Sequence, residues 1–266
     1  MNITAIILAA ATVGIVGLVV GFLLVTAGEK FKVEVNEKEE AVRAELPGNN
    51  CGGCGYPGCD GLAAAIAKGE APVNGCPVGG APVAAKISAV MGVEAGESVK
   101  KVAFVKCAGD CEHAQDKAVY YGLEDCRQAA VVPGRGAKKC TSGCMGFGSC
   151  VKACQFDAIH VVNGVAVVDR KKCVACGKCV AVCPNGLITL IPDSAEYVVQ
   201  CNSQEKGKAV KEACSAGCLG CTACVKQCEF EAISMNGNVA VIDQEKCQKC
   251  GKCADKCSVN VIRRRA

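Results

Sequence analysis

The fold is decided by the stretch Cys173-Val-Ala-Cys176-Gly-Lys-Cys179-Val-Ala-Val-Cys183, whose spacing recurs in Cys247-Gln-Lys-Cys250-Gly-Lys-Cys253-Ala-Asp-Lys-Cys257. The chain has 266 residues, of which 25 are cysteine, whereas tryptophan is absent and aromatic residues make up only 4%. So few large side chains cannot build a core of ordinary size, and small modules then need another source of stability. Disulfide scaffolds space their cysteines irregularly, whereas metal sites use short repeated spacings. The sequence therefore predicts small α+β modules that are stabilised by metal bound through sulfur.

The two stretches belong to a longer internal repeat with a period of 74 residues. Eight cysteines between Cys140 and Cys183 recur 74 residues later, between Cys214 and Cys257. Alternating apolar sequence surrounds Asn163-Gly164 and Asn236-Gly237, which predicts a type I′ hairpin in each unit. The spacing C-x2-C-x2-C-x3-C is that of the bacterial two-cluster ferredoxin, in which the fourth cysteine ligates the other cluster. Two ferredoxin-like units are therefore expected, at residues 137–195 and 196–266.

In this arrangement each 4Fe–4S cluster takes its four thiols from both halves of a unit. The expected sets are Cys218, Cys221, Cys224 and Cys257, then Cys228, Cys247, Cys250 and Cys253, and in the first unit Cys154, Cys173, Cys176 and Cys179. The remaining site departs from the pattern, because Phe147 stands where the second unit has Cys221. We expect its ligands to be Cys140, Cys144, Cys150 and Cys183.

A separate four-cysteine module is expected at residues 51–85. It contains Cys51-Gly-Gly-Cys54-Gly-Tyr-Pro-Gly-Cys59, a predicted helix from Asp60 to Lys68, and then Cys76. Asp60 is the expected N-cap of that helix, and Gly69 is its expected end. Three thiols within nine residues and a fourth beyond a helix fit a 4Fe–4S cluster. Zinc is the alternative, but zinc ribbons pair two separate C-x2-C knuckles.

Five cysteines are left over, and three of them lie in an additional cysteine-containing segment at residues 100–136. We expect a sixth site formed by Cys107, Cys111, Cys126 and Cys201, with Cys214 spare. Cys140 or Cys214 could equally serve this site, and the alternative is that some of these residues are simply buried thiols. The count of cysteines thus predicts about six 4Fe–4S clusters, or roughly 24 iron atoms.

The N-terminal 28 residues carry no charged side chain and are expected to form a transmembrane anchor. As a helix, Ile3 to Ala27 would be about 37 Å long, which exceeds the roughly 30 Å of a bilayer's hydrocarbon layer. A cleaved signal peptide is the alternative, but a basic n-region is missing and the apolar run is too long. Residues 29–50 are expected to be a tether. Lys30 and Lys32 follow the span, which places the rest of the chain in the cytoplasm.

Several classes of function find no support in the sequence. It contains no dinucleotide-binding G-x-G-x-x-G after a strand, no P-loop and no hydrolytic constellation of Ser, Cys and His. The formal net charge is +4, but six oxidised clusters with their thiolates would change it to about −8. Lysines beside the cysteines are then counter-charges, and without aromatics to stack bases a nucleic-acid surface is not expected. One-electron transfer is the chemistry that remains.

The combination of an N-terminal membrane helix, the module from Asn50 to Pro77 and a ferredoxin domain with Cys140-x3-Cys144-x5-Cys150-x3-Cys154 resembles the B subunit of Rnf complexes. The resemblance covers essentially the whole chain. It implies an electron-relay subunit of a membrane-bound, ion-translocating ferredoxin:NAD+ oxidoreductase, located in the inner (cytoplasmic) membrane. Reduced ferredoxin would be the electron donor, and other Rnf subunits would supply the flavins, the NAD site and the ion path.

Two other functions remain open at this point. The chain is alternatively a free-standing, membrane-tethered polyferredoxin, or a subunit of a related complex that reduces a redox-sensing transcription factor. A soluble zinc-binding adaptor is a more distant possibility. For a relay, we expect an acidic ferredoxin to dock on the second unit, where Lys246, Lys249, Lys256 and Arg263 to Arg265 flank the cysteines.

Overall fold

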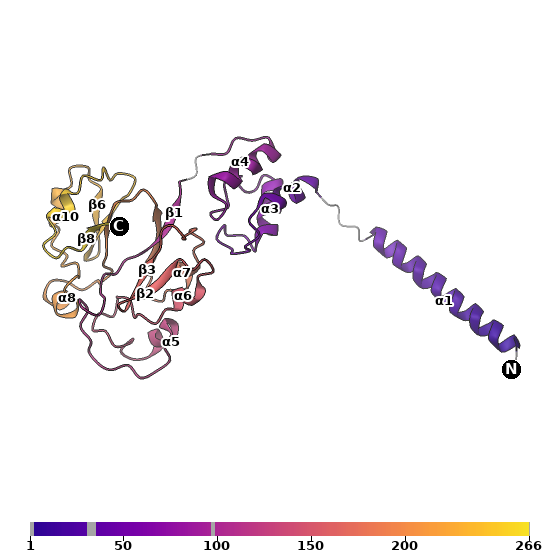
Figure 1. The fold of residues 1–266 in the computed structure, drawn as a ribbon, viewed down its shortest axis with the longest axis horizontal. Coiled ribbons are helices and arrows are strands. Elements are labelled where there is room, and N and C mark those ends of the chain that lie inside the picture. The colour runs from indigo at the N-terminus through magenta and orange to yellow at the C-terminus, as the bar shows by residue number, and fades with distance from the viewer. Residues whose placement is uncertain (1–2, 31–35, 97–98, 266) are drawn as a thin grey trace.

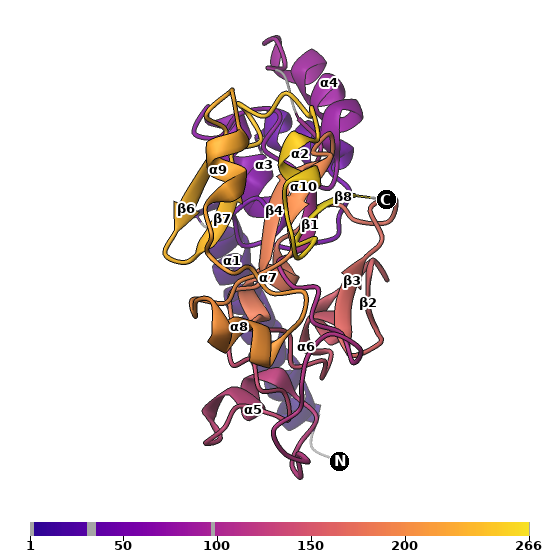
Figure 2. The ribbon, with the colours of Figure 1, turned by 90° about the vertical axis from the view of Figure 1, so that its left-hand side faces the viewer.

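The computed structural model describes residues 3–30, 36–96 and 99–265. Along the chain these residues form an apolar helix, a module of three helices, and two units that combine short helices with two-stranded sheets. Figure 1 shows this order of parts, and Figure 2 shows the same chain turned by 90°. The expected class, small α+β modules with an N-terminal apolar helix, is confirmed.

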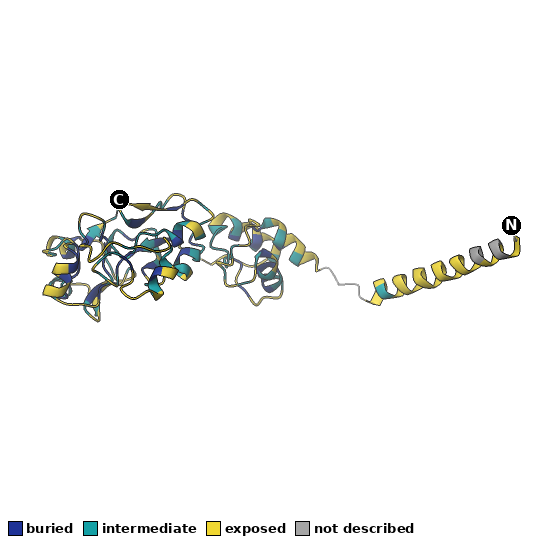
Figure 3. Ribbon diagram, turned by 90° about the horizontal axis from the view of Figure 1, so that it is seen from below, coloured by how far each residue is buried: buried dark blue, intermediate teal, exposed yellow. Residues whose placement is uncertain are grey.

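The helix α1 (Ile3–Lys30) contains a segment, Ala11–Lys30, with a mean hydropathy of 2.2. None of this segment is buried in the chain, and Figure 3 shows it as exposed along almost its whole length. Its length and composition suffice to cross a membrane. Of the expected tether, residues 31–35 lie outside the described residues.

The first module consists of α2 (Glu37–Glu45), α3 (Cys59–Ala67) and α4 (Gly80–Met91). Its core contains Val42, Leu62, Ile66 and Ile87, each with at most 1% of its surface exposed. Val42 lies in the expected tether and Ile87 lies beyond the expected end at residue 85. Residues 51–85 are therefore too short a range for this module, because apolar side chains on both flanks complete its core.

The start of α3 differs from the prediction. The helix begins at Cys59, whose backbone N–H donates to the side-chain oxygen Oδ1 of Asn50 at 2.8 Å. Asp60, the predicted N-cap, instead forms an ion pair with Arg43 of α2. The predicted end is confirmed, since Gly69 has a φ of +77° and its N–H bonds to the carbonyl of Ile66.

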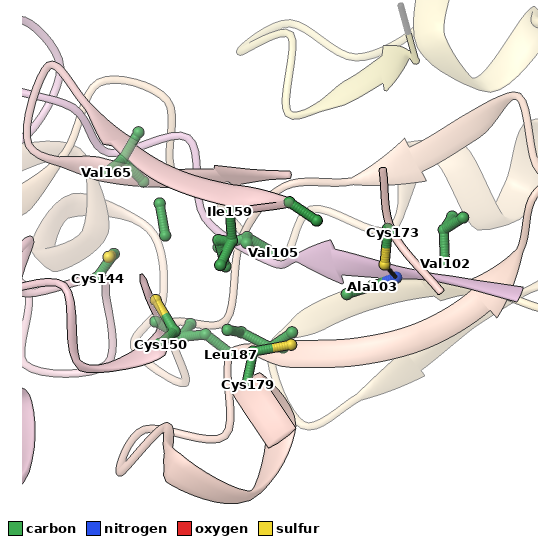
Figure 4. Packing of buried hydrophobic residues seen from close by; sticks show 13 residues of the cluster. Val102, Ala103, Val105, Cys144, Cys150, Ile159, Val165, Cys173, Cys179 and Leu187 are labelled. Carbon is green, nitrogen blue, oxygen red and sulfur yellow. Dashed lines mark hydrogen bonds between the residues drawn. The ribbon is translucent and has the colours of Figure 1, made fainter. Parts of the chain in front are cut away.

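The first ferredoxin-like unit is built around two antiparallel strand pairs. Strand β1 (Lys101–Val105) pairs with β4 (Ile188–Pro192), and β2 (Ile159–Val162) forms a hairpin with β3 (Val165–Val168). The helices are α5 (Cys126–Val131), α6 (Ser149–Ala153) and α7 (Lys178–Val182). Because β1 belongs to the segment 100–136, that segment supplies the first strand of this unit. Figure 4 shows the core, in which Val102, Val105, Ile159 and Leu187 pack among cysteines.

The second unit repeats this plan. Strand β5 (Tyr197–Val199) pairs with β8 (Ile262–Arg264), and β6 (Ile233–Asn236) forms a hairpin with β7 (Val239–Ile242). Its helices are α8 (Lys208–Ala213), α9 (Ala223–Gln227) and α10 (Lys252–Asp255). Two-stranded sheets are marginal on their own. The buried thiols packed beneath them are therefore part of each core.

The two hairpin turns differ in type. In the first hairpin both Asn163 and Gly164 have positive φ, 47° and 75°, as a type I′ turn requires. In the second, the turn residues are Gly237 and Asn238, and of these only Gly237 has a positive φ, 60°. This is the pattern of a type II′ turn. The prediction of type I′ is thus confirmed for the first hairpin and wrong for the second, where the turn lies one residue later.

The module core can be tested by replacing Ile87 with Ala. Ile87 is fully buried, so the variant should lose about 2–5 kcal/mol of stability. The measurement is the denaturant midpoint for loss of visible absorbance under anaerobic conditions. Val90, on the same helix and 36% exposed, provides the control variant Val90→Ala, which should change little. Equal effects of the two variants would contradict the assignment of α4 to the module core.

Candidate iron–sulfur sites

The cysteines lie in the described residues and none of them is disulfide-bonded. In the first module, Cys76 lies close enough to Cys51 and Cys59 to interact electrostatically, and Cys54 packs in the same core. The backbone N–H of Gly79 donates to the Cys76 sulfur at 3.3 Å. The loop between Cys51 and Cys59 turns at Gly52, Gly55 and Gly58, all with positive φ. The four cysteines expected together are thus found together.

Three further groups also match the expected sets. Cys154, Cys173, Cys176 and Cys179 line one cavity of the first unit, where Ala103 of β1 donates its N–H to the Cys173 sulfur at 3.3 Å. In the second unit, Cys224 lies near Cys218, Cys221 and Cys257. Cys253 lies near Cys247 and Cys250, and Cys247 and Cys253 pack in one core with Cys228. The crossed arrangement of thiols therefore exists in both units.

The irregular site of the first unit is grouped differently from the prediction. Its cavity is lined by Cys126, Cys144, Cys150 and Cys183. Cys140, the expected fourth member, lies elsewhere. Cys126 comes from α5, which lies beside α6 in both ribbon views (Figure 1, Figure 2). Phe147 provides no thiol to this site. The fourth thiol is instead that of Cys126, from the segment that precedes the repeat.

A hydrogen-bonded lock holds Cys126 in this position. The backbone N–H of Cys126 donates to Ser149 Oγ at 2.7 Å, and Ser149 Oγ donates to Asp125 Oδ2 at 2.9 Å. Asp125 also caps α5, accepting from the N–H groups of Arg127 and Gln128. The bond from Ser149, followed by those from the helix backbone, lowers the pKa of Asp125. Because Ser149 lies on α6 next to Cys150, the lock joins the two helices that provide thiols.

The last group, which we name the junction pocket, is lined by Cys107, Cys140, Cys201 and Cys214. Only Cys107 and Cys201 of the predicted sixth set are in it. Cys214, predicted to be spare, belongs to the pocket, as does Cys140; both were alternatives that the sequence left open. Cys111 is exposed and lies against the first hairpin turn, where a Cβ added to Gly164 would be 2.7 Å from its sulfur. Cys111 is therefore the cysteine left over.

The donor sets fit a 4Fe–4S cluster. Burial raises the pKa of the Cys150 thiol to about 12, and those of Cys179, Cys214 and Cys253 to about 11. Four thiolates in such places need a compensating positive charge, which an iron cluster supplies. Soft thiolate donors without histidine or carboxylate are the ligands of such clusters. Among the described residues, no group of three or more His, Cys, Asp or Glu fits a single metal ion.

A glycine brings the first module against the first ferredoxin-like unit. A Cβ on Gly53 would lie 2.8 Å from the carbonyl oxygen and 2.9 Å from the Cα of Cys176. Gly53 sits between Cys51 and Cys54, and Cys176 belongs to the set with Cys154. The backbones of two cysteine loops are therefore in direct contact. The pKa of the Cys176 thiol is raised mainly by burial, and the nearby Cys51 raises it further.

Replacing Gly53 with Ala should separate these two loops, because the new methyl group would overlap backbone atoms rather than a movable side chain. We expect weaker magnetic coupling between the reduced centres in electron paramagnetic resonance (EPR) spectra, with the iron content retained. Gly96→Ala is the control, since its Cβ would meet only Asn74 Nδ2 at 3.5 Å. Unchanged coupling in the Gly53 variant would show that this backbone contact does not set the distance between the two centres.

The lock on α5 can be tested with Ser149→Ala. The variant leaves the N–H of Cys126 and a carboxylate oxygen of Asp125 without this partner, so α5 is held less firmly against α6. We expect about four iron atoms per chain to be lost more rapidly to a chelator. Ser215→Ala, at an exposed serine, should behave like the unsubstituted chain. Identical chelation kinetics for all three proteins would argue against the lock.

Two family models match the chain within these modules. A model described as a putative Fe-S cluster matches residues 46–78. A model described as a 4Fe-4S binding domain matches residues 166–189 and 240–263, one match in each ferredoxin-like unit. The first match covers the module with Cys51, and the others cover each second hairpin strand with the C-x2-C-x2-C-x3-C stretch that follows it.

Curated relatives match nearly the whole chain. It is 47% identical to the B subunit of the Na(+)-translocating ferredoxin:NAD(+) oxidoreductase complex of Acetobacterium woodii, over 98% of this chain and 78% of that protein. It is 43% identical to the B subunit of the ion-translocating oxidoreductase complex of Methanosarcina acetivorans, over 92% and 93%. It is 40% identical to the B subunit of the proton-translocating ferredoxin:NAD(+) oxidoreductase complex of Clostridium ljungdahlii, over 99% and 93%. The chain therefore belongs to the family of B subunits of ion-translocating oxidoreductase complexes, the Rnf complexes.

Proposed function

We propose that this chain accepts electrons from reduced ferredoxin and relays them through 4Fe–4S clusters to other subunits of an ion-translocating ferredoxin:NAD+ oxidoreductase. The observation that carries the proposal is the grouping of 24 of its 25 cysteines into six sets of four. Backbone contacts join the first module to the first unit, where Gly53 meets Cys176, and the first unit to the second, where the N–H of Ala108 donates to the carbonyl of Gln200 at 3.0 Å. The sequence contains no dinucleotide-binding motif, so partner subunits would carry out the hydride transfer to NAD+.

The proposed ligands follow these sets, one cluster to each. They are Cys51, Cys54, Cys59 and Cys76; Cys154, Cys173, Cys176 and Cys179; Cys126, Cys144, Cys150 and Cys183; Cys107, Cys140, Cys201 and Cys214; Cys218, Cys221, Cys224 and Cys257; Cys228, Cys247, Cys250 and Cys253. A bound cluster supplies reversible one-electron storage. The chain's own part is to hold the thiolates, to donate backbone N–H bonds to sulfur, and to exclude water.

The chain is anchored by α1 with its remaining modules in the cytoplasm. Support comes from the apolar segment Ala11–Lys30 and from Lys30 and Lys32 at its C-terminal side. In this orientation the first module is the part nearest the membrane along the chain. Its cluster is then the natural point of transfer to membrane subunits, and the second unit is the natural point of entry.

Entry at the second unit is supported by the exposure of its ligands and charges. Cys221 and Cys250 are exposed, whereas several of the other proposed ligands are buried. Lys246, Lys249 and Lys256 are exposed around them. The arginines contribute less than the sequence indicates, because Arg265 is partly buried and donates to the carbonyls of Pro192 and Ala195, and Arg264 pairs with Glu196. A negatively charged ferredoxin would therefore meet mainly lysines.

The relay is tested with the full chain in detergent under anaerobic conditions. Iron and acid-labile sulfide analysis should give about 24 iron atoms per chain. Mixing with reduced ferredoxin should then bleach the visible absorbance of the clusters. A chain with full iron content that reduced ferredoxin cannot bleach would overturn the proposed donor, and isolation from native membranes without other subunits would overturn the complex.

Replacing Lys246, Lys249 and Lys256 with Gln should slow reduction by ferredoxin roughly tenfold at low salt, because electrostatic steering raises association rates. The difference should vanish near 1 M salt, where the Debye length is about 3 Å. Replacing Lys38, Lys68 and Lys86, which are also exposed, makes the same charge change in the first module and is the control. If both triple variants slow reduction equally, overall charge rather than local docking governs the rate.

A further inference from the structure

The junction pocket is built from equivalent positions of the two ferredoxin-like units. Cys140 and Cys214 are one repeat apart, 74 residues. Cys107 follows the last residue of β1 by two positions, and Cys201 follows the last residue of β5 by two positions. Each unit thus contributes one cysteine after its first strand and one cysteine before its first cluster motif. The pocket is a two-sided site, and neither unit can complete it alone.

The backbone around these thiols is equivalent as well. The N–H of Gly109 donates to the Cys107 sulfur at 3.4 Å, and the N–H of Ser203 donates to the Cys201 sulfur at 3.4 Å. Both donors lie two residues after the cysteine that they contact. Hydrogen bonds from N–H groups favour the thiolate that a metal requires. The loops after β1 and β5 therefore both present a cysteine whose thiolate is stabilised by a backbone N–H, as expected for two metal ligands.

Each half of the pocket also touches a cluster site of its own unit. The N–H of Cys144 donates to the Cys107 sulfur at 3.4 Å. Its counterpart one repeat later, Cys218, makes a backbone hydrogen bond to Cys201. Cys144 belongs to the irregular site of the first unit, and Cys218 belongs to a site of the second. The pocket therefore lies between one cluster site on each side, joined to both by single hydrogen bonds.

The lining of the pocket suits an anionic cluster. Cys201 is 8% exposed and Cys214 is 9% exposed. Among the described residues that line the pocket, Lys138 is the one charged side chain. Its ammonium group donates to the carbonyls of Gly109 and Gly164, both at 2.7 Å, which holds the positive charge beside the thiols. A cluster that carries a net charge of about −2 with its thiolates would be stabilised by such a neighbour.

We propose that Cys107, Cys140, Cys201 and Cys214 bind a 4Fe–4S cluster that is the electron bridge between the two ferredoxin-like units. The inference rests on the proposed relay function and adds the route between its halves. Each transfer across the bridge oxidises one cluster and reduces the next by one electron, breaks no bond and moves no proton. Reduced ferredoxin supplies the electron, and the cluster set of the first module receives it last.

The experiment compares Cys214→Ser with Cys111→Ser in the full chain, purified anaerobically in detergent. Cys214 lines the junction pocket, whereas Cys111 is exposed and lines none of the cavities described above. We expect Cys214→Ser to contain about 20 iron atoms and Cys111→Ser about 24. The first variant should also lack one component of the EPR spectrum. Full iron content in Cys214→Ser, or loss of four iron atoms in Cys111→Ser, would overturn the site.

Reduction by ferredoxin tests the bridging role separately. In Cys214→Ser the clusters of the second unit should be reduced as in the unsubstituted chain, and those of the first unit and first module should be reduced much more slowly. Equal rates for all clusters would overturn the bridge even if the iron count confirms the site. If ferredoxin reduces neither variant nor the unsubstituted chain, the proposed donor fails, while the iron counts still decide the site.

A second variant covers the case in which Cys214→Ser loses iron from neighbouring sites. Cys140→Ser removes the equivalent thiol contributed by the other unit. Both variants should lose the same EPR component if the two cysteines bind one cluster. Retention of that component in Cys140→Ser would overturn the shared site.

Discussion

The attraction between buried cysteine sulfur and a positively charged metal centre is the interaction on which this structure depends. The core of the second unit contains Cys201, Cys218, Cys224 and Cys253 beside a few valines and isoleucines. Each sheet has only two strands, and the helices of the two units span at most six residues. Such elements bury too little apolar surface to fold alone. Folding and cluster binding are therefore one process in these units, as in other small metal-stabilised domains.

Much of this architecture could be predicted, because metal ligation imposes short and regular spacings. The C-x2-C-x2-C-x3-C stretches and the 74-residue repeat indicated both units, their hairpins and three of the six thiol groups that the fold brings together, and the separate spacing of Cys51, Cys54 and Cys59 indicated a fourth. Spacing carries no information about residues that are close in space but distant in sequence. Cys126 and Ser149 are an example, since only the folded chain shows that Ser149 holds Cys126 beside Cys150. For the same reason the contact between Gly53 and Cys176 left no trace in the sequence.

One signal in the repeat could have corrected the assignment of Cys140. Because Cys140 and Cys214 occupy equivalent positions, a single role for both is the simplest interpretation of the repeat. Assigning Cys140 to the irregular site and leaving Cys214 spare gave equivalent residues different roles. The structure restores the equivalence, since both line the junction pocket. The repeat then provides only three thiols to the irregular site. The fourth, that of Cys126, comes from outside the repeat.

Phe147 and the segment that carries Cys126 act together at the irregular site. The Phe147 ring packs against Tyr120, with ring centroids 4.9 Å apart, so the residue that replaces a ligand also holds the segment that supplies the new one. Ser149 provides the second attachment, and the second unit has Ala223 at that position, where Cys221 needs no substitute. A cysteine in place of Phe147 would thus add a fifth thiol to this site. It would also remove the ring contact with Tyr120, which helps to hold the segment that carries Cys126. Among the thiol groups of the described residues, the two units therefore differ at one site, and the two-sided junction pocket is unaffected by this difference.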